Sequence, residues 1–282
     1  MTKPKDLILF FGAYDLDDQY ESGRLTVTPE QVIVNEDWNP YVFRFNDDIA
    51  ILVLEDEIYF TKYIRPVCLT SEDPGISDGV VVGWGQSEDT TKLHANKPRK
   101  LEIPILSDGD CYRENSKLAE IAWTKSFCAG RRGAGVCKGD SGGGFFVKFN
   151  QKFYFKGLVS SGITTQGSSD FGTDCYTANY AIYTDVIKYS EFLGIEKISS
   201  KTQTTTIVET TTTAETTMTR DAITSRRTTT KPISNPTCGV MSDESSLVVG
   251  GKFSSREQFP WLVSIFVKND EIYEHFGSGS LI

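Results

Sequence analysis

The sequence predicts an all-β fold, a sandwich or a barrel, over about its first 195 residues. Residues 23–28 (GRLTVT) and 30–34 (EQVIV) alternate apolar and polar positions, as half-buried strands do. Residues 48–56 (DIAILVLED) are apolar on both faces, which indicates a strand buried on both sides. Clusters of Gly, Asp and Ser separate the strand-like segments, at a spacing typical of sandwiches and barrels.

Later elements follow the same pattern. Further strands are expected at residues 79–85 (GVVVGWG), 99–106 (RKLEIPIL) and 153–162 (FYFKGLVSSG). One helix is expected at residues 184–193, where Thr184 is placed to cap the start. Its apolar residues recur at helical spacing: Val186, Ile187, Tyr189 and Phe192.

The composition divides the chain into three parts. Residues 1–197 are β-rich, whereas residues 198–236 are rich in threonine and cannot bury a core. We expect this middle part to be a disordered linker, either an O-glycosylated stalk or an unmodified flexible segment. Residues 237–282 are globular in composition again, with strand and turn material, but they are too short to form a domain alone.

Charge and hydropathy exclude several classes of partner. The formal net charge of −9 and the pI near 4.9 argue against binding to nucleic acid or to an anionic membrane. No apolar run is long enough to span a bilayer. The early run DLILFF is too short for a signal peptide, so a secretory leader is expected to lie outside the sequence.

The six cysteines indicate an oxidising environment. None forms a C-x-x-C pair, and with only two histidines we expect no zinc site and no other cofactor. Their spacing favours disulfides that close medium-sized loops over six buried free thiols. A secreted, extracellular protein is therefore expected.

The stretch KGDSGGG, at residues 138–144, is the strongest chemical motif. Consecutive glycines permit unusual backbone angles, and such a turn can place two N–H groups beside Ser141 as an oxyanion hole. A glycine-rich surface loop is the alternative reading. A serine nucleophile also needs a base, in general a histidine, and the chain offers only His94 and His275.

The motifs NDDIAILVL, YIRPVCL, GWG, FCAG and GLVSSG accompany GDSGGG in this order. With them, residues 7–195 resemble the chymotrypsin-like (trypsin-fold) serine endopeptidases. From Cys238 onward, LVVGG, FPWLVSIF and HFGSGSLI resemble the amino-terminal part of the same family. The style is closest to secreted arthropod proteases of the gastrulation-defective and modular types. The resemblance implies two six-stranded antiparallel β-barrels, the first incomplete here, and a C-terminal helix.

The resemblance assigns the catalytic residues by position. Ser141 matches the nucleophile, and the amides of Gly139 and Ser141 match the oxyanion hole. Asp48 matches the aspartate that orients the histidine, and Ser160 matches a serine that hydrogen-bonds near it. Asp47 is expected to be a solvated neighbour. The family histidine lies in a TAAHC turn, and that string does not occur in the sequence.

Neither histidine matches the missing base. His94 is expected to lie in an exposed polar loop, and His275 matches a structural position. Residues 1–197 thus resemble a protease domain without its histidine-bearing part, and residues 237–282 resemble the head of a second one. We expect the two pieces to dock.

Activation and specificity are implied in the same way. Asp140 matches the carboxylate that pairs with the new amino terminus, here Val248, after an activating protease cuts behind Leu247. The base of the primary pocket is Gly135, where trypsin-like members carry aspartate, and Gly162 and Ala181 match its walls, near Ser160. An uncharged pocket favours a small or apolar residue before the scissile bond.

The disulfides follow from the resemblance as well. The implied pairs are Cys111–Cys128, Cys137–Cys175 and, between the two pieces, Cys68–Cys238. The sequence therefore predicts a secreted serine endopeptidase acting on protein substrates, a zymogen of an extracellular cascade. The alternative is a catalytically inactive homologue that serves as a binding or regulatory module.

Overall fold

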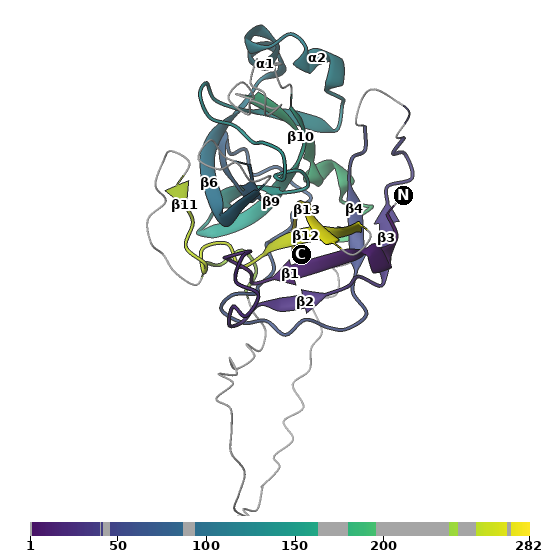
Figure 1. Cartoon of the computed structure of the whole chain (residues 1–282). Coiled ribbons are helices and arrows are strands. Elements are labelled where there is room, and N and C mark those ends of the chain that lie inside the picture. The colour runs from purple at the N-terminus through teal and green to yellow at the C-terminus, as the bar shows by residue number, and fades with distance from the viewer. Residues whose placement is uncertain are drawn as a thin grey trace, which may run out of the picture.

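The computed structural model describes residues 2–39, 41, 46–86, 94–162, 180–195, 237–241, 252–269 and 272–282. The protein is built mainly from antiparallel strands, with a few short helices (Figure 1). Within the described ranges, no helix is long and apolar enough to cross a membrane.

A closed antiparallel barrel of six strands forms one half of the molecule. Its strands pair in the order β6-β5-β8-β9-β10-β7, and β7 pairs back with β6 to close the ring. The strands are β5 (Asp78–Gly85), β6 (His94–Leu106), β7 (Ser126–Gly130), β8 (Gly144–Phe149), β9 (Lys152–Gly162) and β10 (Tyr180–Asp185). Alternate residues point inward and fill the barrel with buried apolar side chains, including Val81, Ile103, Phe145 and Tyr183.

The other half consists of two smaller sheets. A four-stranded sheet has the order β13-β12-β1-β2, and a separate pair joins β3 with β4. The strands are β1 (Leu7–Phe11), β2 (Leu25–Val27), β3 (Gln31–Val34), β4 (Ala50–Val53), β12 (Leu262–Asn269) and β13 (Ile272–Ser280). The all-β prediction is therefore confirmed. Among the described strands, however, the pairing does not form the second six-stranded barrel that the resemblance implied.

Residues from the two ends of the chain share these sheets. β12 pairs with β1, from Leu7↔Val267 to Phe11↔Val263, and lies beside it in Figure 1. The short strand β11 (Lys252–Phe253) adds to the outside of β6. Trp261, which is fully buried, packs its ring on Phe146 and Phe153 of the closed barrel. The described residues within 237–282 thus pack as part of the same folded unit as residues 1–197.

Two of the three expected disulfides are present within the described residues. Cys68–Cys238 joins the two pieces, with Cα atoms 4.9 Å apart, and Cys111–Cys128 ties a short helix to β7. Cys175 lies outside the described residues, so its pairing with Cys137 stays a prediction.

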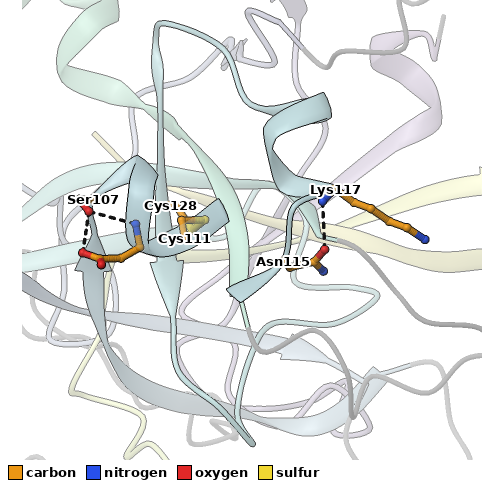
Figure 2. The surroundings of a disulfide bond; sticks show 6 residues. Ser107, Cys111, Asn115, Lys117 and Cys128 are labelled. Carbon is orange, nitrogen blue, oxygen red and sulfur yellow. Dashed lines mark hydrogen bonds between the residues drawn. A yellow bond between two sulfur atoms is a disulfide. The ribbon is translucent and has the colours of Figure 1, made fainter. Parts of the chain in front are cut away.

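Two short helices, α1 (Asp108–Glu114) and α2 (Leu118–Ile121), were not expected from the sequence. Ser107 caps α1, since its side chain accepts a hydrogen bond from the Asp110 amide, and Cys111 on this helix carries the disulfide to Cys128 (Figure 2). The signal was a capping serine followed by acidic residues in the first turn. Both helices are too short for a helical periodicity to be visible in the sequence.

The helix expected at residues 184–193 is shorter and differently capped. A 3₁₀ turn, η3, spans Val186–Tyr189, and a similar turn, η1 (Pro4–Asp6), opens the chain. Thr184 belongs to β10, and its hydroxyl donates to the carbonyl of Asp48 at 3.0 Å instead of capping a helix. A tertiary contact therefore takes the group that the sequence assigned to a local role.

Replacing both cysteines of Cys68–Cys238 by serine should destabilise the protein more than the same change at Cys111–Cys128. The first bond spans 170 residues and the second 17. Because the unfolded chain gains more entropy when the longer loop opens, we expect losses of about 5 and about 3 kcal/mol in the free energy of unfolding. Urea unfolding of the two double variants measures both, and equal losses would show that loop length does not govern the effect.

Candidate active site

Ser141 lies on a tight turn that glycines make possible. Gly139 and Gly142 have φ angles of +87° and +72°, a region that residues with a Cβ rarely adopt. A Cβ at Gly142 would also lie 2.6 Å from the carbonyl oxygen of Ser278. The turn is held by the amides of Gly142 and Gly143, which donate to the carbonyls of Val159 (2.9 Å) and Asp140 (2.8 Å).

Ser141 and its neighbouring amides remain available for other partners. Ser141 itself is exposed. Within the described part of the chain, the amide N–H groups of Gly139 and Ser141 donate no hydrogen bond. An oxyanion hole requires two such donors, so the turn retains the groups that the sequence assigned to it.

The Asp140 carboxylate anchors the turn by accepting hydrogen bonds from two backbone amides. Its Oδ1 accepts from the Gly85 amide and its Oδ2 from the Cys137 amide, each at 2.9 Å. A Cβ at Gly83 or Gly85 would collide with this carboxylate, which explains why the GWG motif carries glycine at both positions. Part of the residue remains accessible, but the carboxyl group is tightly enclosed. That burial raises its pKa to about 6, against the two amide hydrogen bonds, which lower it.

Asp48 is positioned by two hydroxyl groups. The Ser160 hydroxyl donates to Oδ2 of Asp48 at 2.7 Å, and Thr184 holds the Asp48 carbonyl. Burial raises the pKa of Asp48, and the hydrogen bond from Ser160 opposes that rise. Ser160 therefore contacts the aspartate that the resemblance paired with it.

Asp47 is not the solvated neighbour expected from the sequence. It is buried and has a φ of +56°, a strained angle for a residue other than glycine. Its Oδ1 accepts from Lys125 Nζ at 2.8 Å and from the Tyr189 hydroxyl at 3.0 Å. The ion pair and hydrogen bond fix the backbone immediately before Asp48. Sequence reasoning missed this role because the two partners lie 78 and 142 residues away.

Ser141 and Asp48 line one cavity of about 710 Å³. Ser141 and Gly142 contribute one part of its wall and Asp48 another, and Ser278 and Ser280 of β13 also line it. The rest of the wall is mainly apolar. The nucleophile and the acid of the sequence hypothesis thus face a common space.

Both histidines lie outside that cavity wall. His94 begins β6 and His275 lies in β13, with ring centroids 5.3 Å apart, so His94 is not in the exposed loop that we expected. Among the described residues, neither buried ring nitrogen of His275 has a hydrogen-bond partner. Burial and the neighbouring His94 lower the pKa of His275 to about 4, so this ring is neutral at pH 7.

The remaining predicted site residues are only partly described. Gly162 lies directly opposite Ala181 in the β9–β10 pair; Ala181 is buried and Gly135 is exposed. Val248 lies outside the described residues, so its ion pair with Asp140 stays a prediction. Described residues give Asp140 no ion pair.

A closed antiparallel barrel, a glycine-rich serine turn and a serine-bound aspartate in one cavity together define the chymotrypsin-like class of serine protease. The sequence model of the Trypsin family matches residues 5–193, and the chain belongs to this family.

Curated relatives agree with this placement. Serine protease gd of Drosophila melanogaster is 26% identical over 67% of the chain and 41% of its own length. Complement C1s subcomponent of Sus scrofa is 29% identical over 67% of the chain and 28% of its own length. Phenoloxidase-activating factor 1 of Holotrichia diomphalia is 34% identical over 52% of the chain and 38% of its own length. The chain therefore spans well under half of each relative.

Asp140→Asn should remove a pH-dependent part of the stability. The folded-state pKa of about 6 exceeds the usual value of 3.8, so folding favours the protonated carboxyl group. The stabilisation from this group is complete below pH 3.8 and is lost as the pH rises through 6. As the pH rises across this window, the free energy of unfolding of the native protein should therefore fall by about 2 kcal/mol, allowing for partial solvent access. Asp140→Asn should not show this fall.

Urea unfolding at pH 4 and pH 7 measures this difference. The matched control is Asp56→Asn, at an exposed residue, which should keep the native pH dependence. If Asp140→Asn and the native protein lose the same stability between the two pH values, Asp140 does not titrate in this range.

Asp47→Asn and Asp47→Ala should separate the charge of Asp47 from its backbone role. Asparagine tolerates a positive φ and keeps an acceptor for Tyr189, so we expect it to cost about 1 kcal/mol, the value of the partly exposed ion pair with Lys125. Alanine at this position is strained by the positive φ and loses the hydrogen bond from Tyr189, so it should lower the free energy of unfolding by about 2 kcal/mol more than asparagine does. Only alanine should loosen the backbone at Asp48 and lower the pKa of Asp48, measured by carboxyl ¹³C NMR. An unchanged Asp48 pKa in both variants would contradict a positioning role.

Proposed function

We propose that the protein is a serine-type endopeptidase that cleaves proteins through an acyl-enzyme. The observation that carries this proposal is the shared cavity of Ser141 and Asp48, with Ser160 hydrogen-bonded to the aspartate. Membership of the Trypsin family supports it. The glycine-rich turn beside Ser141 supplies two amides for an oxyanion.

In the proposed mechanism, the Ser141 oxygen attacks the substrate carbonyl as a histidine takes the hydroxyl proton. The amides of Gly139 and Ser141 stabilise the oxyanion, and Asp48 orients the imidazole. The same imidazole then protonates the leaving amine, and water attacks the acyl group by the reverse route. We propose that this histidine is not one of the two in the sequence, since neither lines the cavity.

The proposed primary pocket is uncharged. Gly135 at its base and Gly162 and Ala181 at its walls offer no partner for a basic side chain. Burying a charged residue there would leave it unpaired, so small or apolar residues before the scissile bond are favoured. We therefore propose protein substrates that carry a small or apolar residue before the scissile bond.

We also propose that the protein is a secreted, extracellular zymogen. An activating protease that cuts after Leu247 would free the Val248 ammonium to pair with Asp140. The enclosed Asp140 carboxylate, with its raised pKa, suits such a cation, which would stabilise its charged form. In this proposal residues 237–282 resemble the head of a second protease domain but pack with residues 1–197, to which the threonine-rich linker at residues 198–236 joins them.

A catalytically inactive homologue that binds or regulates other proteins is the second candidate. The position of both histidines outside the cavity wall favours it. It leaves unexplained why the serine turn and the bond between Ser160 and Asp48 are both intact.

A fluorophosphonate probe distinguishes the two candidates. Applied to the activated protein isolated from secreting cells together with any polypeptide bound to it, so that the histidine absent from this sequence can be supplied, the probe should label Ser141, because only an activated serine displaces fluoride from phosphorus. Ser141→Ala should abolish labelling, and Asp48→Asn should slow it by at least about a hundredfold. Absence of labelling in protein with a free Val248 amino terminus would favour the inactive homologue.

A further inference from the structure

The two histidines of the sequence form a pair outside the cavity of Ser141. His94 begins β6 and His275 lies in β13, and their ring centroids are 5.3 Å apart. Neither residue lines the cavity. We expected no zinc site from a sequence with so few histidines, but the fold brings both of them together.

Each ring has a nitrogen that can serve as a metal ligand. Nδ1 of His94 lies 3.3 Å from the Ala95 carbonyl oxygen, which can only accept, so the hydrogen belongs on Nδ1 and the lone pair on Nε2. In His275, both ring nitrogens are buried, and neither has a hydrogen-bond partner in the described part of the chain. A buried polar group without a partner costs free energy, which a bound metal ion would offset.

The distance between the two rings fits a tetrahedral metal ion. For two imidazoles on one tetrahedral zinc ion, with Zn–N bonds of about 2.1 Å, the ring centroids lie about 5.2 Å apart. A right angle between the two ligands, as in square-planar or octahedral sites, brings the centroids to about 4.5 Å. The observed 5.3 Å agrees with the tetrahedral arrangement, and the angle of 57° between the ring planes excludes face-to-face stacking.

Strands and one aromatic neighbour hold the two rings in place. Phe266 of β12 pairs with His275 across the sheet, and its ring meets both imidazoles edge-on, 5.3 Å from His275 and 6.5 Å from His94. Ligands that are fixed on strands hold their geometry more closely than ligands on loops. Glu274 and Phe276, on either side of His275, are exposed, so the pair lies near the surface, where an ion can reach it.

We propose that His94 and His275 bind one zinc ion through their Nε2 atoms, with water in the remaining positions. Within the described ranges, no group of three or more His, Cys, Asp or Glu side chains is placed to hold a metal. Two imidazoles would therefore be the whole contribution of the described chain, and an open coordination position would remain.

The proposed site adjoins the serine turn but is separate from the cavity. A Cβ at Gly139 would lie 3.2 Å from Nδ1 of His275, so the ring rests directly against this residue of the turn. Nδ1 thus faces the turn, which leaves Nε2 as the ligand. Zinc would fix the ring of His275 against the turn without contacting Ser141.

The test titrates the whole chain, residues 1–282, with zinc chloride in competition with a chromophoric zinc indicator. The native chain should bind one zinc ion. His94→Phe and His275→Phe keep a ring against Phe266 but remove the nitrogens. Because losing even an outer-shell partner of a metal ligand weakens binding about tenfold, each variant should weaken it by at least that factor.

Two matched variants test where the ion lies. Glu274→Gln changes the exposed carboxylate next to His275, and Ser141→Ala removes the hydroxyl of the serine turn. Both should bind zinc as the native chain does. Far-ultraviolet circular dichroism shows whether each variant is folded.

Cobalt binding by the native chain is a second measurement that needs no variant. Tetrahedral Co²⁺ absorbs strongly in the visible range and octahedral Co²⁺ only weakly, so the geometry of the site can be read directly. We expect the strong spectrum, and we expect zinc to remove it.

Several outcomes would overturn the proposal. These are the absence of zinc binding by the native chain, native affinity in both phenylalanine variants, or a weak octahedral cobalt spectrum. Loss of zinc in Ser141→Ala would place the ion in the cavity and would overturn it as well. None of these measurements uses peptidase activity, so their result is independent of the proposed function.

Discussion

The pairing of β12 with β1 is the interaction on which the rest of this structure depends. It joins residues 7–11 to residues 263–267, more than 250 positions apart in sequence. The pairing brings β13 alongside the serine turn, where the Ser278 amide holds the Ser141 carbonyl. The Cys68–Cys238 disulfide also links the C-terminal piece to residues 1–197 covalently. Without this pairing the apolar face of β1 would be exposed to water, and the cavity would lose one wall.

Enclosed carboxylates form the framework of the candidate site. Asp140 holds the turn through two amides, and Asp47 holds the segment before Asp48 through Lys125 and Tyr189. Each is costly to bury unless its hydrogen bonds are made, so each stabilises only one backbone arrangement. The glycines of the GWG motif belong to this framework, since they make room for the Asp140 carboxylate. Rigid support of this kind is what a nucleophile and its acid partner require.

Sequence reasoning succeeded where the signal is local. The alternation at residues 30–34 and the GVVVGWG run correspond to β3 and β5. The apolar run at 48–56 does contain the strand β4, but Ala50 is exposed and Ile51–Val53 are only partly buried, so the expected burial on both sides was wrong. It failed where a distant group intervened. Thr184 binds the Asp48 carbonyl instead of capping a helix, and Asp47 is buried by Lys125 and Tyr189. The short helix α1 was missed because seven residues are too few to show a helical period.

The sequence by itself determined the class of fold, the family and the serine turn, because strand alternation and consecutive glycines act through the backbone of neighbouring residues. It also identified Ser160 as a contact of Asp48, through resemblance. Only the tertiary structure decided that Ser141 and Asp48 share one cavity and that both histidines pack outside its wall. The physical reason is that these relations depend on how strands from opposite ends of the chain pair, and pairing partners leave no local trace in either segment.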